Sequence, residues 1–228
     1  MEKQLGVVFA GGEGPQPETL RRILDGRDAA RFSNAVLVAA DFGLILAEAA
    51  GLKPDWIIGD MDSLDSEDRL RSYPADRVIR HPAGKDYSDT ELALALLWEK
   101  GCTEAWIAGG GGGRIDHLLG IRDLFERELF PRRWITAAED IYCIDGDAAD
   151  GSAAALTVNP EQGNLVSVFL LGDGPWKAES KGLKWPLDNV RWKRGLYGLS
   201  NVAMEAEITI NAQQGRFMII LEGMWRRA

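Results

Sequence analysis

The sequence predicts an α/β fold, in which an N-terminal α/β domain with a mostly parallel sheet precedes a C-terminal antiparallel β-sandwich domain. Two observations lead to this prediction. Up to about residue 140, short apolar runs alternate with segments that carry apolar residues at helical spacing, which is typical of a parallel sheet. Beyond that point only short strand-like runs remain, separated by turn signals. We therefore expect an α/β domain over residues 1–140 and a β-sandwich domain over residues 141–228.

Five apolar runs are expected to form the strands of the first domain. They cover residues 5–10, 35–40, 55–58, 77–80 and 105–108. Two intervening segments, 43–50 and 89–100, show helical spacing. The second has Ser88 in position to cap its N-terminus, with Glu91 completing a capping box and Gly101 ending the helix.

The second domain is expected from the runs LTV, LVSVFLL, AEITI and RFMIIL. Turn signals separate these runs, among them Asp145-Gly146 and Gln214-Gly215. Several short strands at close spacing favour a small antiparallel sandwich.

The charge balance limits the classes of partner. The chain has 26 basic and 35 acidic residues, a formal net charge of −9. It has no general attraction for nucleic acid or for an anionic membrane surface, so we expect neither as a partner. No run reaches the roughly 20 apolar residues of a membrane span, and the N-terminal apolar stretch is too short for a signal peptide. We expect a soluble, cytoplasmic protein. Cys102 and Cys143 are expected to be buried thiols, although a disulfide between them stays open.

Acidic residues follow two of the predicted strands. Asp41 comes directly after the run 35–40, and Asp60 and Asp62 follow the run 55–58. If the segment from Asp60 to Asp62 is extended, these two carboxylates point the same way. Carboxylates about 4 Å apart repel by on the order of 4 kcal/mol at a surface-like dielectric, so a cluster of this kind favours a bound cation. Magnesium suits carboxylate and phosphate oxygens; the alternative is a solvated, Asp-rich turn.

Two further motifs could meet phosphate. Lys85 lies just before the predicted helix 89–100, and Asp89 is its first residue. The alternative role for Asp89 is to stabilise the helix N-terminus, where acidic side chains interact favourably with the helix dipole. A run of five glycines ends in Gly112-Gly113-Arg114-Ile115-Asp116-His117. Glycines let a backbone approach a ligand, successive amides can form an anion nest, and Arg114 offers a fork for phosphate oxygens. The loop is neither a Walker A nor a Rossmann motif, and a tight connection is the plainer alternative.

Taken in order, these motifs resemble the thiamine pyrophosphokinase family. The matches are Asp41-x-Gly43, Lys53-Pro54-Asp55 with Ile58-Gly59-Asp60-x-Asp62-Ser63, Lys85 to Glu91, Gly112-Gly113-Arg114-x-Asp116-His117, Gly182-Leu183-Lys184-Trp185-Pro186-Leu187 and Gly198-Leu199-Ser200-Asn201. The resemblance covers nearly the whole chain. It implies an ATP-binding catalytic domain, a thiamine-binding β-sandwich, and a homodimer with thiamine near the subunit interface.

The resemblance also implies roles for individual residues. The residues that would hold Mg²⁺ and the ATP phosphates are Asp41, Asp60, Asp62 and Asp89. Further ATP contacts would come from Gly43, Lys85, Gly112 and Gly113, with Arg114 and Asp116 at the transfer site. Thiamine would meet Ser200, Asn201 and Trp185, and core packing is the alternative for Trp185.

The implied activity is that of a thiamine diphosphokinase. The thiamine hydroxyl attacks the β-phosphorus of ATP in line, giving thiamine pyrophosphate and AMP without a covalent enzyme intermediate. Asp116 or a member of the acidic cluster is the candidate proton acceptor. The alternatives are a pyrophosphokinase acting on another alcohol, such as a hydroxymethylpterin, and a non-catalytic protein that binds thiamine or nucleotide. Retention of Ser200-Asn201 favours thiamine, and retention of all four aspartates favours catalysis.

The chain departs from the family pattern at two places. Ile121 stands where an Asn usually follows the Asp-His pair, and Leu44 and Ile45 replace a small residue or Asn. The first is expected to change a helix contact near the nucleotide, and the second to reshape the substrate pocket.

Overall fold

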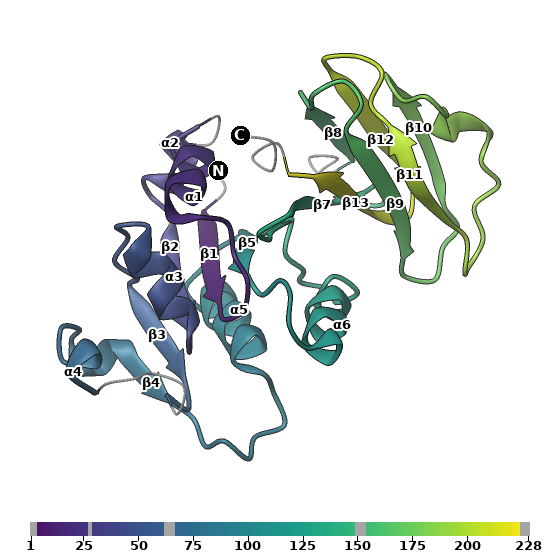
Figure 1. The fold of residues 1–228 in the computed structure, drawn as a ribbon. Coiled ribbons are helices and arrows are strands. Elements are labelled where there is room, and N and C mark those ends of the chain that lie inside the picture. Colours follow the sequence, from purple (N-terminus) through teal and green to yellow (C-terminus); the bar gives the residue numbers. More distant parts are fainter. Residues whose placement is uncertain (1–3, 27–28, 62–66, 149–153, 224–228) are drawn as a thin grey trace. The chain divides into compact units, whose positions relative to one another are not determined.

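The computed structural model describes residues 4–26, 29–61, 67–148 and 154–223, and it divides into two compact units after Ala137 (Figure 1). The boundary expected at 140/141 falls within β7 (Glu139–Asp145), the first strand of the C-terminal unit. None of the helices in the described part of the chain has the length and hydropathy that a membrane span requires.

The N-terminal unit is built around a parallel sheet. Its strands are β1 (Leu5–Ala10), β2 (Val36–Ala40), β3 (Trp56–Gly59), β4 (Val78–Arg80), β5 (Glu104–Gly109) and β6 (Arg133–Ile135). Its helices are α1 (Pro17–Leu24), α2 (Ala29–Phe32), α3 (Gly43–Ala49), α4 (Glu67–Leu70), α5 (Asp89–Glu99) and α6 (Ile115–Leu124), with a 3₁₀ turn at Ala75–Arg77. The strands lie in the order β6-β5-β1-β2-β3-β4, and every neighbouring pair is parallel. The parallel α/β architecture expected from the sequence is confirmed.

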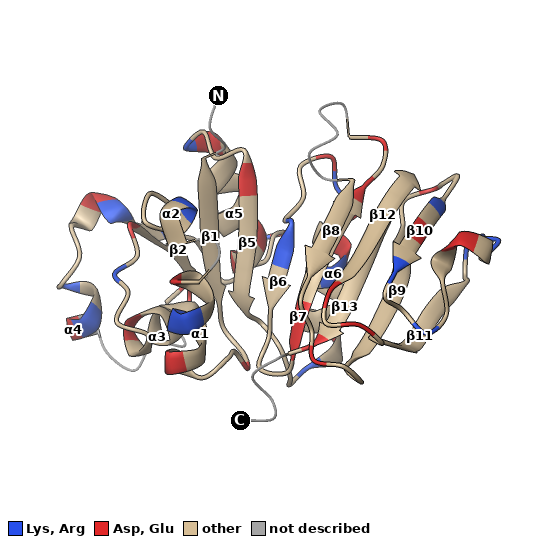
Figure 2. Cartoon of the chain, turned by 90° about the horizontal axis from the view of Figure 1, so that it is seen from above, with Lys and Arg blue, Asp and Glu red and all other residues tan. Residues whose placement is uncertain are grey.

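The central strands of this unit are buried on both faces. Neither β1 nor β2 carries a charged residue (Figure 2), and all six residues of β1 are buried, as a sheet covered on both sides requires. On one face Phe9 packs in a core cluster with Leu20 and Leu24 of α1. Gly6 lies on the other face, where an added Cβ would come 2.6 Å from Leu97 of α5. Helices α1 and α5 therefore cover opposite faces of the sheet.

The five predicted strands and two predicted helices of this unit are present, each with ends within one residue of the expected positions. Helices α1 and α6 and strand β6 were not predicted. The signal for α1 is present in the sequence, since Leu20, Ile23 and Leu24 lie at helical spacing after Pro17. For the other two the signal is weak, because Gly120 interrupts the pattern of α6 and β6 has only three residues.

The C-terminal unit is an antiparallel sandwich, as expected. After β7 come β8 (Ala155–Val158), β9 (Leu165–Leu171), β10 (Lys177–Lys181), β11 (Tyr197–Val202), β12 (Ile208–Gln214) and β13 (Arg216–Glu222), with a 3₁₀ turn at Leu187–Asn189. One sheet has the order β11-β9-β13-β7 and the other β10-β12-β8. Val166 and Val168 of the first sheet share a core with Ile208 and Ile210 of the second. The period-2 alternation of these residues places one face of each sheet in the interior.

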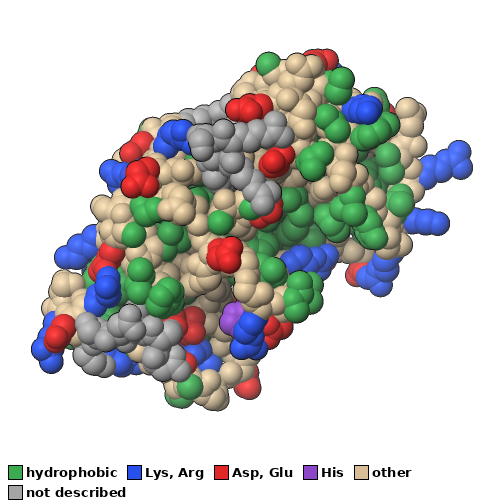
Figure 3. Space-filling model, viewed as in Figure 1, with side chains coloured by type: hydrophobic (Ala, Val, Ile, Leu, Met, Phe, Trp, Pro, Cys, Tyr) green, Lys and Arg blue, Asp and Glu red, His purple; other side chains and the backbone are tan. Residues whose placement is uncertain are grey.

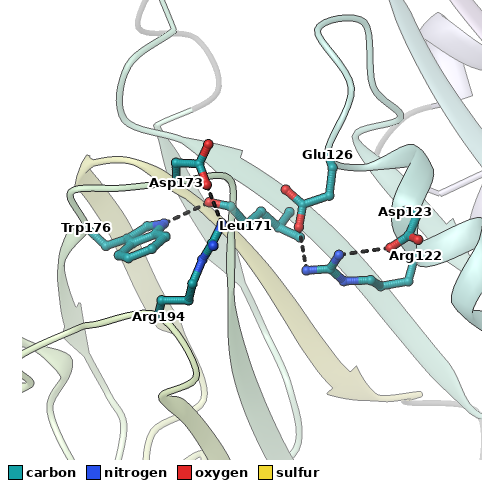
Figure 4. Close-up of polar contacts among 7 residues, drawn as sticks. All are labelled: Arg122, Asp123, Glu126, Leu171, Asp173, Trp176 and Arg194. Atoms are coloured by element: carbon teal, nitrogen blue, oxygen red, sulfur yellow. Dashed lines mark hydrogen bonds and ion pairs between the residues drawn. The ribbon is translucent and has the colours of Figure 1, made fainter.

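Polar contacts fix the loop that follows β9. The Trp176 indole N–H donates to the Leu171 carbonyl over 2.8 Å, and Arg194 pairs with Asp173 (Figure 4). Hydrophobic side chains also gather on the surface of this unit (Figure 3), where Leu165, Tyr197 and Leu199 are exposed on β9 and β11. Cys102 and Cys143 are both buried and both free, so they do not form a disulfide with each other.

Candidate functional site

Three aspartates converge at the carboxyl edge of the parallel sheet. Asp41 follows β2, Asp60 follows β3 and Asp89 is the first residue of α5. One carboxylate oxygen of each lies within 4.8 Å of the others, and all three residues are partly buried. Because β2 and β3 are parallel neighbours, their carboxyl ends meet at one edge, which is where α/β sheets place ligands.

The backbone around Asp41 packs closely against β1 and β3. Asp41 has φ 47°, in the left-handed region that Asp tolerates better than most residues, and its N–H donates to the Ile58 carbonyl over 2.9 Å. A Cβ added at Gly59 would lie 3.0 Å from the Asp41 Cβ. A Cβ added at Gly43 would lie 1.9 Å from the Phe9 carbonyl oxygen, so α3 begins directly against β1. Gly43 thus has a structural role besides the ATP contact that the family resemblance implies.

The segment after Asp60 differs from the expectation. Met61 has φ 62°, so the extended segment on which the paired orientation of Asp60 and Asp62 depended is interrupted at Met61. Met61 is buried in a core cluster with Leu44 and Ile57, and this packing fixes the turn. Asp62 itself lies outside the described residues.

Lys85 lies among the aspartates. Its Nζ is 3.0 Å from Oδ1 of Asp89 and 4.0 Å from Oδ2 of Asp60, and 13% of its side chain is exposed. Carboxylates at this separation repel one another by on the order of 4 kcal/mol per pair, and Lys85 offsets part of that repulsion. The all-oxygen donor set of the three aspartates fits a hard divalent cation such as Mg²⁺.

A capping box fixes the start of α5 and therefore the position of Asp89. The Glu91 N–H donates to Ser88 Oγ over 3.3 Å, and the Ser88 N–H donates to Glu91 Oε2 over 2.8 Å. Glu91 also pairs with Arg127. Burial pushes the pKa of Glu91 upward, but the hydrogen bonds from Ser88 and Arg127 outweigh it and hold the pKa below its ordinary value of 4.5.

Glu91→Gln is therefore expected to lower stability in a pH-dependent way. A depressed pKa in the folded state contributes stability above the ordinary pKa, and that contribution is lost as the pH falls through the folded value. We expect a loss of about 0.5–1 kcal/mol at pH 7 that shrinks as the pH falls below 4.5 and disappears below the lowered pKa of the folded state, measured by urea unfolding at pH 7 and at acid pH. Glu99→Gln, at the exposed far end of the same helix, is the control, and an equal loss at both pH values would contradict the assignment.

The glycine run after β5 is held in place by a residue that the sequence analysis did not single out. Glu13 and Gly111 form an antiparallel bridge, with N···O distances of 2.7 and 2.9 Å, and a Cβ at Gly112 would lie 2.3 Å from the carboxylate carbon of Glu13. The Gly111 amide is thus bound to Glu13 and does not contribute to an anion nest, and a nest formed by the Gly112 and Gly113 amides stays a prediction. Nothing in the local sequence around Glu13 signals this contact.

Arg114 and Asp116 pair with each other at the start of α6. Arg114 Nε donates to Asp116 Oδ1 over 3.1 Å, a second contact joins the guanidinium to Oδ2, and both side chains are exposed. The hydrogen bond from Arg114 lowers the pKa of Asp116, and the same bond raises the pKa of Arg114. In the described part of the chain, no hydrogen bond or ion pair links Arg114 or Asp116 to the three clustered aspartates.

The candidate thiamine residues lie in the C-terminal unit and differ in exposure. The Trp185 side chain is exposed, at 54%, so the core-packing alternative for it is wrong. Ser200 is exposed and has φ 57°. Asn201 is buried, at 6%, and its side chain binds the backbone of Trp185.

The departures from the family pattern lie in packed positions. Leu44 is fully buried in a core cluster with Met61 and Tyr73. It therefore does not line a substrate pocket, contrary to the expectation from the sequence. Ile121 is buried, and a Cβ at Gly110 would lie 2.5 Å from its Cδ1. Ile121 therefore packs under the glycine run.

Comparison with known proteins gives a consistent result. The family model described as the thiamin pyrophosphokinase catalytic domain matches residues 30–131. Thiamine pyrophosphokinase of Bacillus subtilis (strain 168) is 36% identical over 84 residues, which cover 36% of this chain and 39% of that protein. The sequence alignment thus spans well under half of that relative.

Solved structures extend the likeness over the whole fold. The crystal structure of thiamine pyrophosphokinase from Bacillus subtilis aligns with a TM-score of 0.74 and 24% identity, covering 96% of this chain and 99% of that one. The structure from Geobacillus thermodenitrificans gives 0.69 and 25%, covering 98% and 99%. The yeast structure gives 0.65 and 15%, covering 97% and 87%.

The fold and site define a class of two-domain proteins in which a parallel α/β catalytic domain with an acidic cluster is followed by a β-sandwich. Within this class, the domain match and the structural likeness agree. Residues 30–131 match the thiamin pyrophosphokinase catalytic domain, and the fold of the chain resembles those of solved thiamine pyrophosphokinases.

Proposed function

We propose that this protein transfers the pyrophosphate group of ATP to the hydroxyl of thiamine, giving thiamine pyrophosphate and AMP. The observation that carries the proposal is the convergence of Asp41, Asp60 and Asp89 around Lys85 at the carboxyl edge of the sheet. Partly buried carboxylates at such distances favour the binding of a metal cation beside Lys85, and a polyphosphate substrate brings one with it.

Magnesium is the proposed metal, held by Asp41, Asp60 and Asp89; Asp62, outside the described residues, belongs to the same proposal. When bound, the ion neutralises phosphate charge and orients the ATP polyphosphate. Lys85 is close enough to the cluster to contact the same phosphates as a point charge. Arg114, whose Nε and one terminal nitrogen now face Asp116, offers its planar fork to phosphate oxygens once ATP competes for it.

The reaction forms one bond and breaks one. The thiamine oxygen bonds to the β-phosphorus, the bond from the β-phosphorus to the α,β-bridging oxygen breaks, and that oxygen leaves with AMP while the β,γ bridge stays intact. The hydroxyl proton needs an acceptor. Asp116 and a member of the acidic cluster are the candidates: the hydrogen bond from Arg114 lowers the pKa of Asp116, and a bound cation would lower the basicity of a cluster carboxylate in the same way.

Thiamine is proposed to bind at the C-terminal unit. Trp185 presents a largely exposed indole, and aromatic rings and cationic groups both bind well against indole faces. Ser200 lies in β11, and its hydroxyl is exposed for hydrogen bonding. A homodimer in the cytoplasm completes the proposal and rests on the family likeness; light scattering of the purified protein tests the dimer.

The test is product analysis of the purified protein with ATP, Mg²⁺ and thiamine. Equal amounts of AMP and thiamine pyrophosphate, both lost when the metal is chelated, are the expected result. AMP without thiamine pyrophosphate would contradict the transfer. If neither product forms, hydroxymethylpterin replaces thiamine in the same assay, and turnover there would overturn the proposed acceptor.

A further inference from the structure

The Asn201 side chain clasps the peptide backbone of Trp185. Its Oδ1 accepts hydrogen bonds from the N–H groups of Trp185, at 3.1 Å, and Val202, at 2.9 Å. Its Nδ2 donates to the Trp185 carbonyl over 2.7 Å. The oxygen of this buried amide therefore accepts two hydrogen bonds and its nitrogen donates one, all to backbone groups of the protein.

An irregularity in β11 turns Asn201 inward. The pairing of β11 with β9 shifts register between Gly198 and Asn201, and Ser200 has φ 57°. As a result the regular alternation fails, with Leu199 and Ser200 both exposed and Asn201 buried. Bulges of this kind re-aim side chains and are common beside functional sites.

The segment that carries Trp185 is anchored on both sides of the clasp. The Lys184 N–H donates to the Val202 carbonyl over 2.9 Å, and the Leu187 N–H donates to Ser180 Oγ over 3.0 Å. Lys184 Nζ also lies 4.6 Å from the centre of the Trp185 ring. The backbone at Trp185 is thus fixed while its indole faces solvent, an arrangement that stabilises an exposed aromatic side chain in a binding-ready position.

We propose that Asn201 is a positioning residue for thiamine binding: it holds the backbone of Trp185 so that the indole is presented to the substrate, and it does not itself contact thiamine. This inference rests on the proposed function. It differs from the role that the family resemblance implies for Asn201, because the buried amide is already bound to the protein.

A double-mutant cycle separates the two roles. Asn201→Ala is expected to raise the KM for thiamine about tenfold, with kcat and the KM for ATP changed less than twofold. In a Trp185→Ala background, Asn201→Ala is expected to add no further rise, because its effect passes through Trp185. Asn211→Ala is the matched control, since Asn211 bonds to Glu179 in the same unit and not to Trp185. An equal rise in both backgrounds would overturn the proposal.

A spectroscopic readout makes the test independent of turnover. The indole N–H signal of Trp185, assigned with Trp185→Phe in ¹⁵N-labelled protein, is expected to shift or broaden in Asn201→Ala and to stay in place in Asn211→Ala. An unchanged signal would overturn the positioning role. If Asn201→Ala does not fold, Asn201→Asp keeps an acceptor for both N–H groups but replaces the donor to the Trp185 carbonyl by a repelling oxygen, so the same shift is expected. Failure of the proposed function has a different signature, since the wild-type protein then forms no thiamine pyrophosphate.

Discussion

Asp60→Asn lowers the turnover of thiamine pyrophosphate synthesis by roughly 10²–10³-fold at saturating Mg²⁺, if the three aspartates hold the metal. The change keeps the size and shape of the side chain and removes the charge that balances the cation. Initial rates over a range of Mg²⁺ concentrations measure the effect, and full activity of the variant at saturating Mg²⁺ would remove Asp60 from the metal site.

A binding readout distinguishes lost metal from lost structure. Removing one of three mutually repelling carboxylates is expected to leave the metal-free protein as stable as the wild type or more so. Mg²⁺ is expected to raise the Tm of the wild type and not that of Asp60→Asn, because only bound ligand stabilises the folded state. Asp76→Asn, which changes a carboxylate that is 80% exposed beside Arg77, is the control and is expected to retain both the rate and the shift.

Gly43→Ala is expected to lower the free energy of unfolding by about 3 kcal/mol. The added methyl group would lie 1.9 Å from the Phe9 carbonyl oxygen and 2.8 Å from the Ala10 nitrogen. Both are backbone atoms of β1, so no side-chain rotation can relieve the contact. Helix α3 must then shift away from β1, and it carries the turn at Asp41 with it. Urea unfolding measures the loss, and a reduced Mg²⁺ response would report the displaced Asp41.

Gly120→Ala is the matched control within a helix. A Cβ at Gly120 meets nothing within 4 Å, so the same change is expected to stabilise α6 by about 0.5–1 kcal/mol through helix propensity. Equal effects at the two glycines would show that the contact with Phe9 does not determine the cost at Gly43.

The sequence predicts those parts of the fold whose signal is local. The strands of the N-terminal unit are continuous apolar runs because both faces of a parallel sheet are buried, and such runs stand out from polar surroundings. Asp41 and Asp60 could be assigned to one edge because each directly follows a strand, and parallel neighbours end together. The capping box could likewise be predicted, because Ser88 and Glu91 lie only three positions apart in the sequence.

The missed features depend on contacts between distant residues or on backbone conformation. Met61 adopts a left-handed turn because it is buried in the core, which its neighbours in the sequence do not reveal. Glu13 reaches Gly111 across the sheet edge, with nearly the whole α/β unit between them in the chain. Asn201 turns inward because of a register shift with β9, and a pattern of alternating residues cannot report a shift of this kind.

The glycine run after β5 limits how this protein can be redesigned. Gly109, Gly110, Gly112 and Gly113 all have positive φ, between 62° and 91°. Any L-residue with a side chain would strain the backbone there, and Gly111, the fifth glycine, has Glu13 and Thr136 too close for a Cβ. A mutant library aimed at a new nucleotide preference would therefore gain little from varying the loop itself. Productive diversity has to enter through the side chains that border the loop, of which Glu13 is the nearest to Gly112.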